Sequence, residues 1–442
     1  MIRKQFVTSM AIVLGALTVG QPVLAQSAPA SFDVLDYTAT VRPNIPTKTV
    51  AGEVAIHLRV LARELRTLEF DRGDLLVDRV VAQGQALDFD LLPRKVEVDL
   101  PASVAAGELL DLSIAYHGAP SSGLLFAPER EQVYTVFTTS QWLVCVDAPG
   151  DKATIDLRVV LPAALRAVGT GALVSEESDA SGAVVHRWRQ ETPISTYLFG
   201  FAAGRFVESA TSGANTVRLL GEGVTPDELG RIFRDTPDML DFFTRRAGMP
   251  YPDATYTQVL VASTVGQEAG GYALLSEEYG RAVLKDPTAV SLIAHELAHQ
   301  WWGNLVTCID WTHFWLNEGF ATFMAAAYDE HRFGRDTYLQ DIERARMRYE
   351  TVRKAGHDRS LAFPDWRRPT ADDRTLVYQK GAYVLHLLRE QLGEDAFWSG
   401  IRHYTEVHRG GSVTTDDFRR SMEESSGRDL GAFFNTWIYL RQ

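Results

Sequence analysis

Cysteine and basic charge are both scarce in this 442-residue sequence, and each scarcity excludes a class of protein. The two cysteines, Cys145 and Cys308, are too few for a disulfide framework and too distant in sequence to suggest a thiolate metal site. A single bond between them and two buried free thiols both remain open, because the sequence cannot place their Cα atoms. The 44 basic residues are outnumbered by 57 acidic ones, and the resulting formal charge of −13 argues against binding to nucleic acid or to anionic membrane surfaces.

Long apolar runs are rare as well, and the one candidate lies at the N-terminus. Arg3 and Lys4 precede an apolar run from about Ala11, and a Val-Leu-Ala segment ends at Ala25, which predicts a secretory signal peptide over 1–25. The alternative is an uncleaved anchor, but the run is short for a span of about 20 residues. We therefore expect an exported protein, periplasmic or secreted, with no stable membrane insertion once the signal peptide is removed.

The residue pattern of the remaining chain changes once, near residue 207. Up to about residue 206, short segments alternate apolar and polar residues between Gly, Pro and Asp turn signals, as strands do. Beyond that point, capped segments with a helical period dominate. This pattern predicts an α+β protein, with an all-β domain of sandwich or saddle type at 26–206 and a mostly α-helical domain at 207–442.

Two histidines four residues apart, His295 and His299, lie in the helical half. An aspartate–proline pair predicts a helix from about residue 287 to 302. Four residues turn such a helix by about 400°, so both imidazoles share one face and can bind one zinc ion at about 2.0–2.1 Å. Glu296 can then face a zinc-bound water as general base, in the H-E-x-x-H arrangement. The competing interpretation is a core helix with two satisfied histidines.

A catalytic zinc site needs a third protein ligand and an open position for water. Glu318 in "WLNEGFA", in the next predicted helix, is the candidate, with eighteen residues between it and His299. It could instead be an ordinary first-turn carboxylate stabilised by the helix dipole. However, an unpaired carboxylate in this tryptophan-rich, apolar frame would be costly to bury, so a metal ligand is the better interpretation.

At this point the sequence resembles the aminopeptidase N and leukotriene hydrolase family of zinc metallopeptidases, a branch of the gluzincins. The resemblance runs from about residue 33 to 440. It is carried by "HELAHQWWGNLVT" with "WLNEGFA", by "CVDAPGDKATIDLRVVLP", by "TYLFGFAAGRF" and by "SSGRDLGAFFNTWIY". It implies that the helical half is a thermolysin-like zinc catalytic domain.

The resemblance also implies roles for single residues. His295, His299 and Glu318 fall on the family's zinc ligands, Glu296 on its general base, and Tyr378 in "YQKG" on the tyrosine that stabilises the oxyanion. The chemistry agrees, since a bound zinc polarises the carbonyl and a phenol adds a hydrogen bond where negative charge develops.

Recognition of the substrate's amine is where the sequence departs from the family, which uses a Gly-x-Met-Glu-Asn motif. An ungapped alignment of "GQEAGG" places Glu268 on the amine-binding glutamate and Gln267 on the methionine. We expect Glu268 to bind the amine, with Gln267, Gly266, Gly270 and Gly271 as its substrate-binding neighbours. A second alignment starts the motif at Gly270 and Gly271 and leaves no glutamate.

Two further departures concern the surroundings of the site. Ten residues before Cys145 the family carries Gln or Glu as a second amine contact, whereas Thr135 stands here unless a loop brings in Gln132. Larger members continue into a C-terminal helical domain, so we expect a short form with a more open cleft.

Together these features predict a zinc metallo-aminopeptidase with one Zn²⁺ per chain, which removes N-terminal residues from peptide substrates. Two alternatives stay open: a zinc endopeptidase with an open cleft, and a non-catalytic peptide-binding member of the fold. Intact Glu296 and Tyr378 argue against the second. Epoxide hydrolysis is disfavoured because Thr370 stands where one branch of the family uses an aspartate. The preferred N-terminal residue, the physiological substrate and the oligomeric state do not follow from the sequence.

Overall fold

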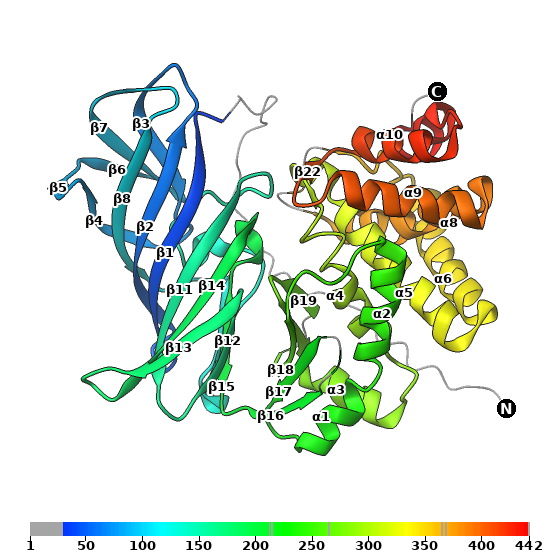
Figure 1. Cartoon of the computed structure of the whole chain (residues 1–442), viewed down its shortest axis with the longest axis horizontal. Helices are drawn as coiled ribbons and strands as arrows, with labels where there is room; N and C mark the ends of the chain where they lie inside the picture. Colours follow the sequence, from blue (N-terminus) through cyan, green and yellow to red (C-terminus); the bar gives the residue numbers. More distant parts are fainter. Residues whose placement is uncertain are drawn as a thin grey trace.

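The computed structural model describes residues 30–211, 213, 215–263, 266–363, 366 and 369–440. The predicted signal peptide at 1–25 lies outside these residues. A part made of strands and a part made mostly of helices lie side by side, so the protein has the predicted α+β architecture (Figure 1). Within the described ranges, no helix combines the length and apolar character needed to cross a membrane.

The N-terminal part consists of three sheets. The largest has eight strands in the order β13-β14-β11-β1-β2-β8-β4-β5, and the others are β3-β7-β6 and β12-β15-β10-β9. The strands are β1 (Phe32–Asn44), β2 (Thr49–Val60), β3 (Glu64–Asp71), β4 (Leu76–Ala82), β5 (Gln85–Ala86), β6 (Phe89–Leu92), β7 (Lys95–Ala105), β8 (Leu109–Gly118), β9 (Leu124–Ala127), β10 (Gln132–Thr135), β11 (Lys152–Pro162), β12 (Arg166–Gly169), β13 (Ala172–Ser178), β14 (Ala183–Ser195) and β15 (Phe201–Gly204).

Alternation of side chains explains why these segments form sheets around one core. In β2, for example, Val54, Ile56, Leu58 and Val60 are buried, while the residues between them are exposed or half-buried. A period of two places all four on the same face of the strand. That face packs into the apolar core of the β part, as the sequence predicts.

The C-terminal part begins with a five-stranded sheet that the sequence analysis did not predict. Its order is β16-β17-β18-β20-β19, which leaves β19 at an edge. The strands are β16 (Val207–Thr211), β17 (Thr216–Gly221), β18 (Thr255–Val261), β19 (Gly266–Ala269) and β20 (Tyr272–Ser276), and the short pair β21 (Thr307–Cys308) and β22 (Ser412–Val413) forms separately.

Helices make up most of the remaining C-terminal part. They are α1 (Pro226–Ile232), α2 (Thr236–Ala247), α3 (Glu277–Lys285), α4 (Ser291–Ala298), α5 (Trp315–Phe333), α6 (Arg335–Lys354), α7 (Ala371–Thr375), α8 (Gly381–Leu392), α9 (Glu394–Val407), α10 (Thr415–Ser426) and α11 (Gly431–Phe434). A π-helical turn, η5 (Leu376–Lys380), links α7 to α8.

The helix predicted for about 287–302 is wrong at both ends, because α4 begins at Ser291 and ends at Ala298. Asp286 accepts a hydrogen bond from the backbone N–H of Thr288 at 3.0 Å and forms a turn instead of capping α4.

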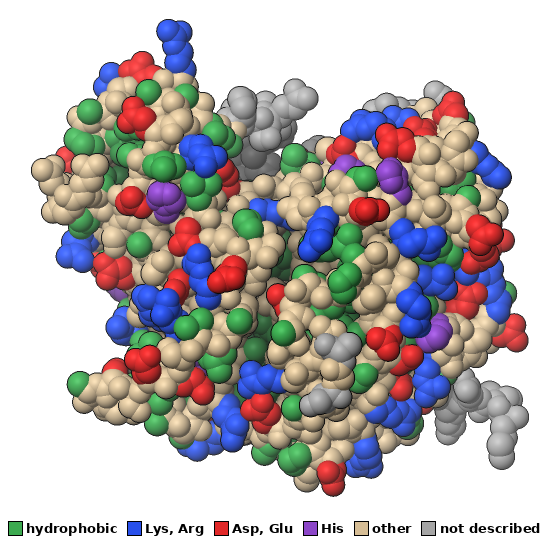
Figure 2. Space-filling view, viewed as in Figure 1, with side chains coloured by type: hydrophobic (Ala, Val, Ile, Leu, Met, Phe, Trp, Pro, Cys, Tyr) green, Lys and Arg blue, Asp and Glu red, His purple; other side chains and the backbone are tan. Residues whose placement is uncertain are grey.

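Polar contacts join the two parts. Arg130 from the β part donates to both carboxylate oxygens of Glu277, at 2.8 and 3.1 Å, and Lys152 donates to the carbonyls of Leu305 and Gly411. Both cysteines are buried and unbonded, which settles the alternative left open by the sequence in favour of free thiols. On the face seen in Figure 2, acidic and basic side chains are interspersed over both parts.

Candidate active site

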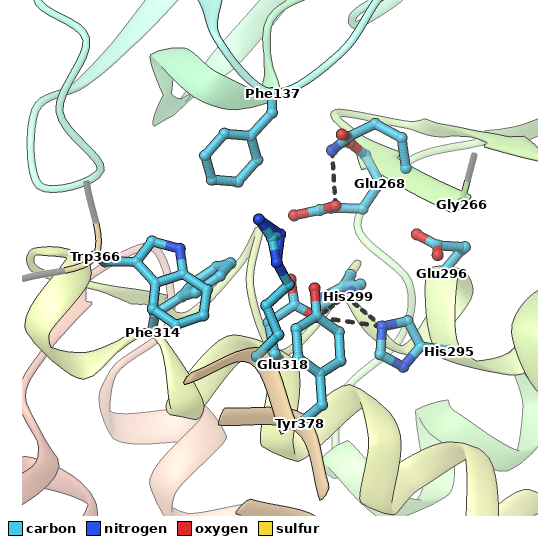
Figure 3. Close-up of a pocket in the computed structure, with 12 residues that line it drawn as sticks. Phe137, Gly266, Glu268, His295, Glu296, His299, Phe314, Glu318, Trp366 and Tyr378 are labelled. Atoms are coloured by element: carbon cyan, nitrogen blue, oxygen red, sulfur yellow. Dashed lines mark hydrogen bonds and ion pairs between the residues drawn. The ribbon is translucent and has the colours of Figure 1, made fainter. Parts of the chain in front are cut away.

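Three side chains that could hold a metal ion converge between α4 and α5. The Nε2 atom of His295 and the Nε2 atom of His299 lie 3.2 Å apart, and they lie 3.2 and 3.4 Å from Oε2 of Glu318. All three residues are buried, and the dashed lines in Figure 3 join them. Ligands at about 2.1 Å from a tetrahedral zinc ion are separated by about 3.4 Å, so this donor set fits zinc.

Hydrogen bonds hold these side chains in place from both parts of the chain. The ring Nδ1 of His299 lies 3.1 Å from the carbonyl of Trp302, which fixes the orientation of the imidazole. Asn317, next to Glu318, donates to the hydroxyl of Tyr197 at 3.0 Å, and Tyr197 donates to the carbonyl of Gly303 at 3.1 Å. Tyr197 belongs to the "TYLFGFAAGRF" segment of the β part, so that segment supports the metal-binding helices directly.

Tyr378 reaches the site because two helices approach closely. A Cβ atom on Gly319 of α5 would lie 3.0 Å from Cα of Gly381, so only glycine allows this contact. The contact brings η5 against α5, and the ring of Tyr378 stacks on the ring of His295 with centroids 5.9 Å apart. Burial and then the neighbouring carboxylates, Glu318 first, raise the pKa of Tyr378 well above its usual value. The phenol therefore keeps its proton at neutral pH and can donate it in a hydrogen bond.

Glu296 projects from α4 beside the ligands and lines the same pocket. A Cβ atom on residue 266 would lie 2.4 Å from Oε1 of Glu296, so Gly266 leaves room for this carboxylate. Burial raises the pKa of Glu296 well above its usual value, and the His299 ring opposes that shift. A carboxyl group next to a metal site with a raised pKa is suited to accepting and returning a proton.

Glu268 lies on the edge strand β19 and lines the pocket with Gly266 and Gln267. Its Oε2 accepts a hydrogen bond from Gln267 at 2.8 Å, whereas its buried Oε1 has no hydrogen-bond partner among the described residues. Burial raises the pKa of Glu268 to about 7. A buried carboxylate oxygen without a partner is a site for a donor supplied by a ligand.

The other predicted substrate-binding residues lie elsewhere. Gly270 and Gly271 are not among the residues that line the pocket. Gly270 packs against Ile194 and Thr170 of the β part, and Gly271 has a φ of 82°, which glycine adopts without strain. They form the turn between β19 and β20.

Among the described residues of the β part, none offers a second carboxylate or amide to the pocket. Thr135 binds the backbone N–H and carbonyl of Phe201, and Gln132 donates to Glu222 at 2.7 Å, away from the site. Phe137 lines the pocket instead, with a φ of 49° that is unusual for a bulky residue. Its ring contacts that of Trp311, with the centroids 5.0 Å apart.

Four lining residues were missed by the sequence analysis: Phe137, Phe314, Trp366 and Arg374. The aromatic frame around Glu318 was a signal for Phe314. Arg374 stands four residues before Tyr378, a spacing that places two helical residues on one face. Phe137 and Trp366 reach the pocket only through the tertiary fold.

Comparisons with known proteins agree with this arrangement. A family model described as the peptidase M1 N-terminal domain matches residues 34–198, and one described as the peptidase family M1 domain matches residues 233–437. The chain is 27% identical to aminopeptidase M1-D of Oryza sativa subsp. japonica, and 26% identical to aminopeptidase N of Lactobacillus helveticus. Each alignment covers 91% of this chain, which spans about half the length of either relative, 49% and 50%.

Solved structures match over nearly the whole chain. A mutant M1 zinc metallopeptidase from Deinococcus radiodurans, bound to a Tyr-Ser-Ala substrate, superposes with a TM-score of 0.78 at 25% identity. The match covers 93% of this chain and 95% of that one. A two-domain M1 zinc metallopeptidase mutant bound to L-tryptophan gives the same TM-score at 24% identity and shows the same fold.

Proposed function

The chain belongs to the M1 peptidase family, and we propose that it is a zinc-dependent aminopeptidase that removes N-terminal residues from peptides. The observation that carries this proposal is a single pocket lined by a converging His-His-Glu set, a neighbouring glutamate, a buried tyrosine and the Oε1 atom of Glu268, which has no hydrogen-bond partner in the described residues. His295, His299 and Glu318 would hold one zinc ion per chain. When bound, zinc supplies Lewis-acid polarisation of the peptide carbonyl and makes water acidic enough to deprotonate near neutral pH.

Other side chains of the pocket transfer the proton, stabilise the oxyanion and exclude water. Glu296 accepts the proton of the attacking water and passes it to the leaving amine. Tyr378 donates a hydrogen bond to the carbonyl oxygen as it gains negative charge. The apolar walls of Phe137, Phe314 and Trp366 limit access of bulk water, which strengthens both interactions.

Glu268 favours an exopeptidase over an endopeptidase. A substrate ammonium group would satisfy its partnerless Oε1 and compensate the burial of the charge. An internal peptide segment presents a neutral amide there, which leaves the buried carboxylate without a counter-charge. Glu268 thus positions the first peptide bond of the substrate over the metal ligands.

Export belongs to the same proposal and rests on the residue pattern at 1–25 alone. Protein recovered from a periplasmic extract should begin at Gln26 on N-terminal sequencing. Recovery of a chain that begins at Met1 in the membrane fraction would indicate the uncleaved anchor, and a chain that begins at Met1 in the cytosolic fraction would contradict export.

The test of the function compares free-amine aminoacyl reporters with an N-blocked peptide that contains internal cleavage sites. An aminopeptidase hydrolyses the reporters and leaves the blocked peptide intact. Cleavage within the blocked peptide would assign an endopeptidase instead, and binding of both substrates without hydrolysis would assign a non-catalytic peptide-binding protein.

A further inference from the structure

Arg374 is a cation in a pocket that otherwise carries carboxylates. The pocket is lined by Glu268, Glu296 and Glu318, and Arg374 stands with the aromatic residues in its lining. In the proposed function the zinc ion and the substrate ammonium group would engage Glu318 and Glu268, which leaves the guanidinium group available for an anion that a substrate brings. It has no role in the proposed mechanism.

The acids next to Arg374 in the sequence are already paired. Asp372 binds His357 at 2.5 Å, and Asp373 pairs with Arg359. Nη2 of Arg374 makes one long contact, 3.4 Å to the carbonyl of Pro369. Its Nη1 is buried and has no hydrogen-bond partner in the described part of the chain. A partnerless guanidinium nitrogen lining a substrate pocket is a site for an acceptor that a ligand brings.

The position of Arg374 fits a group close to the scissile bond. It precedes Tyr378 by four residues on the continuous α7–η5 segment, which is about one helical turn. A carboxylate three or four bonds from the reacting carbonyl carbon can therefore reach the guanidinium group while the carbonyl oxygen faces Tyr378.

The layout of the pocket indicates which part of a substrate carries the carboxylate that reaches Arg374. Figure 3 shows Phe137, Phe314 and Trp366 on one side of the Glu268 carboxylate, and Gly266 and Glu296 on the other. With the amine at Glu268 and the attacked bond near Glu296, the side chain of the first residue falls toward the aromatic wall. Arg374 lines the same pocket as these aromatic residues.

We propose that Arg374 binds a substrate carboxylate next to the scissile bond, namely the side chain of an N-terminal aspartate or glutamate. This inference rests on the proposed aminopeptidase function and names its substrate class. The planar guanidinium can donate two parallel hydrogen bonds to a carboxylate, and the aromatic rings bury the methylene groups of the acidic side chain. The C-terminal carboxylate of a dipeptide presents the same chemistry from the other side of the bond, and the test separates the two sources.

The test measures kcat/KM for glutamyl and glutaminyl reporters, which differ in charge and scarcely in shape. In the wild type, the glutamyl substrate should be favoured about tenfold or more, as expected for a charge-assisted pair. Arg374→Leu should bring the ratio to one or below, and Arg374→Lys should keep part of the preference because a point charge remains. Arg346→Leu, which removes an exposed arginine paired with Glu343, is the matched control and should leave the ratio unchanged.

The ratio is internal to each variant, so partial loss of folded protein does not alter it. Hydrolysis of alanyl and leucyl reporters with no glutamyl preference in the wild type, or with a preference that survives Arg374→Leu, would overturn this inference and leave the aminopeptidase function intact. A tenfold preference for dipeptides over their amides that disappears in Arg374→Leu would support carboxylate binding by Arg374 and place it at the C-terminal side. Absence of hydrolysis with every reporter would refute the proposed function itself; binding of glutamyl and glutaminyl peptides to Glu296→Gln would then decide the inference.

Discussion

Replacement of Glu268 by glutamine tests whether Glu268 binds the substrate's amine or is a buried acid with no role in binding. Glutamine keeps the shape of the side chain and removes its charge. We expect kcat/KM for a free-amine peptide to fall, and kcat/KM for the N-acetylated twin to change little, because the acetylated substrate has no charge to pair with Glu268.

The magnitude follows from the surroundings of Glu268. The side chain is 5% exposed, and its Oε1 has no other partner in the described residues. Thr135 is engaged with Phe201, and Phe137 is the lining residue that the described β part contributes, so those residues supply no second anchor. A lost charge-assisted contact in such a site costs about 2–4 kcal/mol of transition-state binding, or about 30- to 700-fold in kcat/KM.

The assay is a cycle of two substrates and two proteins, with Glu278→Gln as control. Glu278 is an exposed glutamate at the start of α3, outside the pocket lining. The wild type should prefer the free amine by the factor above, Glu268→Gln should lose most of the preference, and the control should keep it. Equal rates on both substrates in the wild type would refute the anchor and favour an endopeptidase.

Three further substitutions probe the base, the oxyanion donor and a buried acid. Glu296→Gln should keep zinc and lower turnover by about 10²–10⁴-fold; turnover near wild type would place the base elsewhere. Tyr378→Phe should cost about 10²–10³-fold with zinc retained, whereas loss of zinc would make the tyrosine structural. Burial raises the pKa of Asp329 to about 7, only partly offset by Arg344, so stability should fall as pH rises from about 4 to 7. Denaturant titration should therefore show that Asp329→Asn increases the free energy of unfolding, relative to the wild type, by about 2 kcal/mol more at pH 8 than at pH 5. An equal increase at both pH values would contradict the buried charge.

Local patterns predicted the parts of the site that a single helical turn determines. The spacing of His295 and His299 requires only a helix, and α4 provides it although it starts later than Pro287 indicated. Prediction of Glu318 as the third ligand depended on its apolar frame and on the family resemblance, because eighteen residues of loop and helix separate it from the histidines.

Parts of the site that depend on pairing between distant segments were harder to predict. Two alignments of "GQEAGG" were open because β19 takes its register from β20, with Glu268 opposite Ala273. That register brings Glu268 to the pocket and leaves Gly270 and Gly271 in the turn. Phe137 reaches the pocket from the β part through a positive φ, for which the sequence carries no signal.

The central claim is that His295, His299 and Glu318 bind the zinc ion on which peptide hydrolysis depends. Its most direct test is a titration of zinc into chelated, metal-free protein, with bound metal and hydrolysis of a free-amine reporter measured in the same samples. The account predicts no hydrolysis without metal and activity that rises in proportion to bound zinc until about one ion per chain is reached. Full activity of the metal-free protein would contradict it.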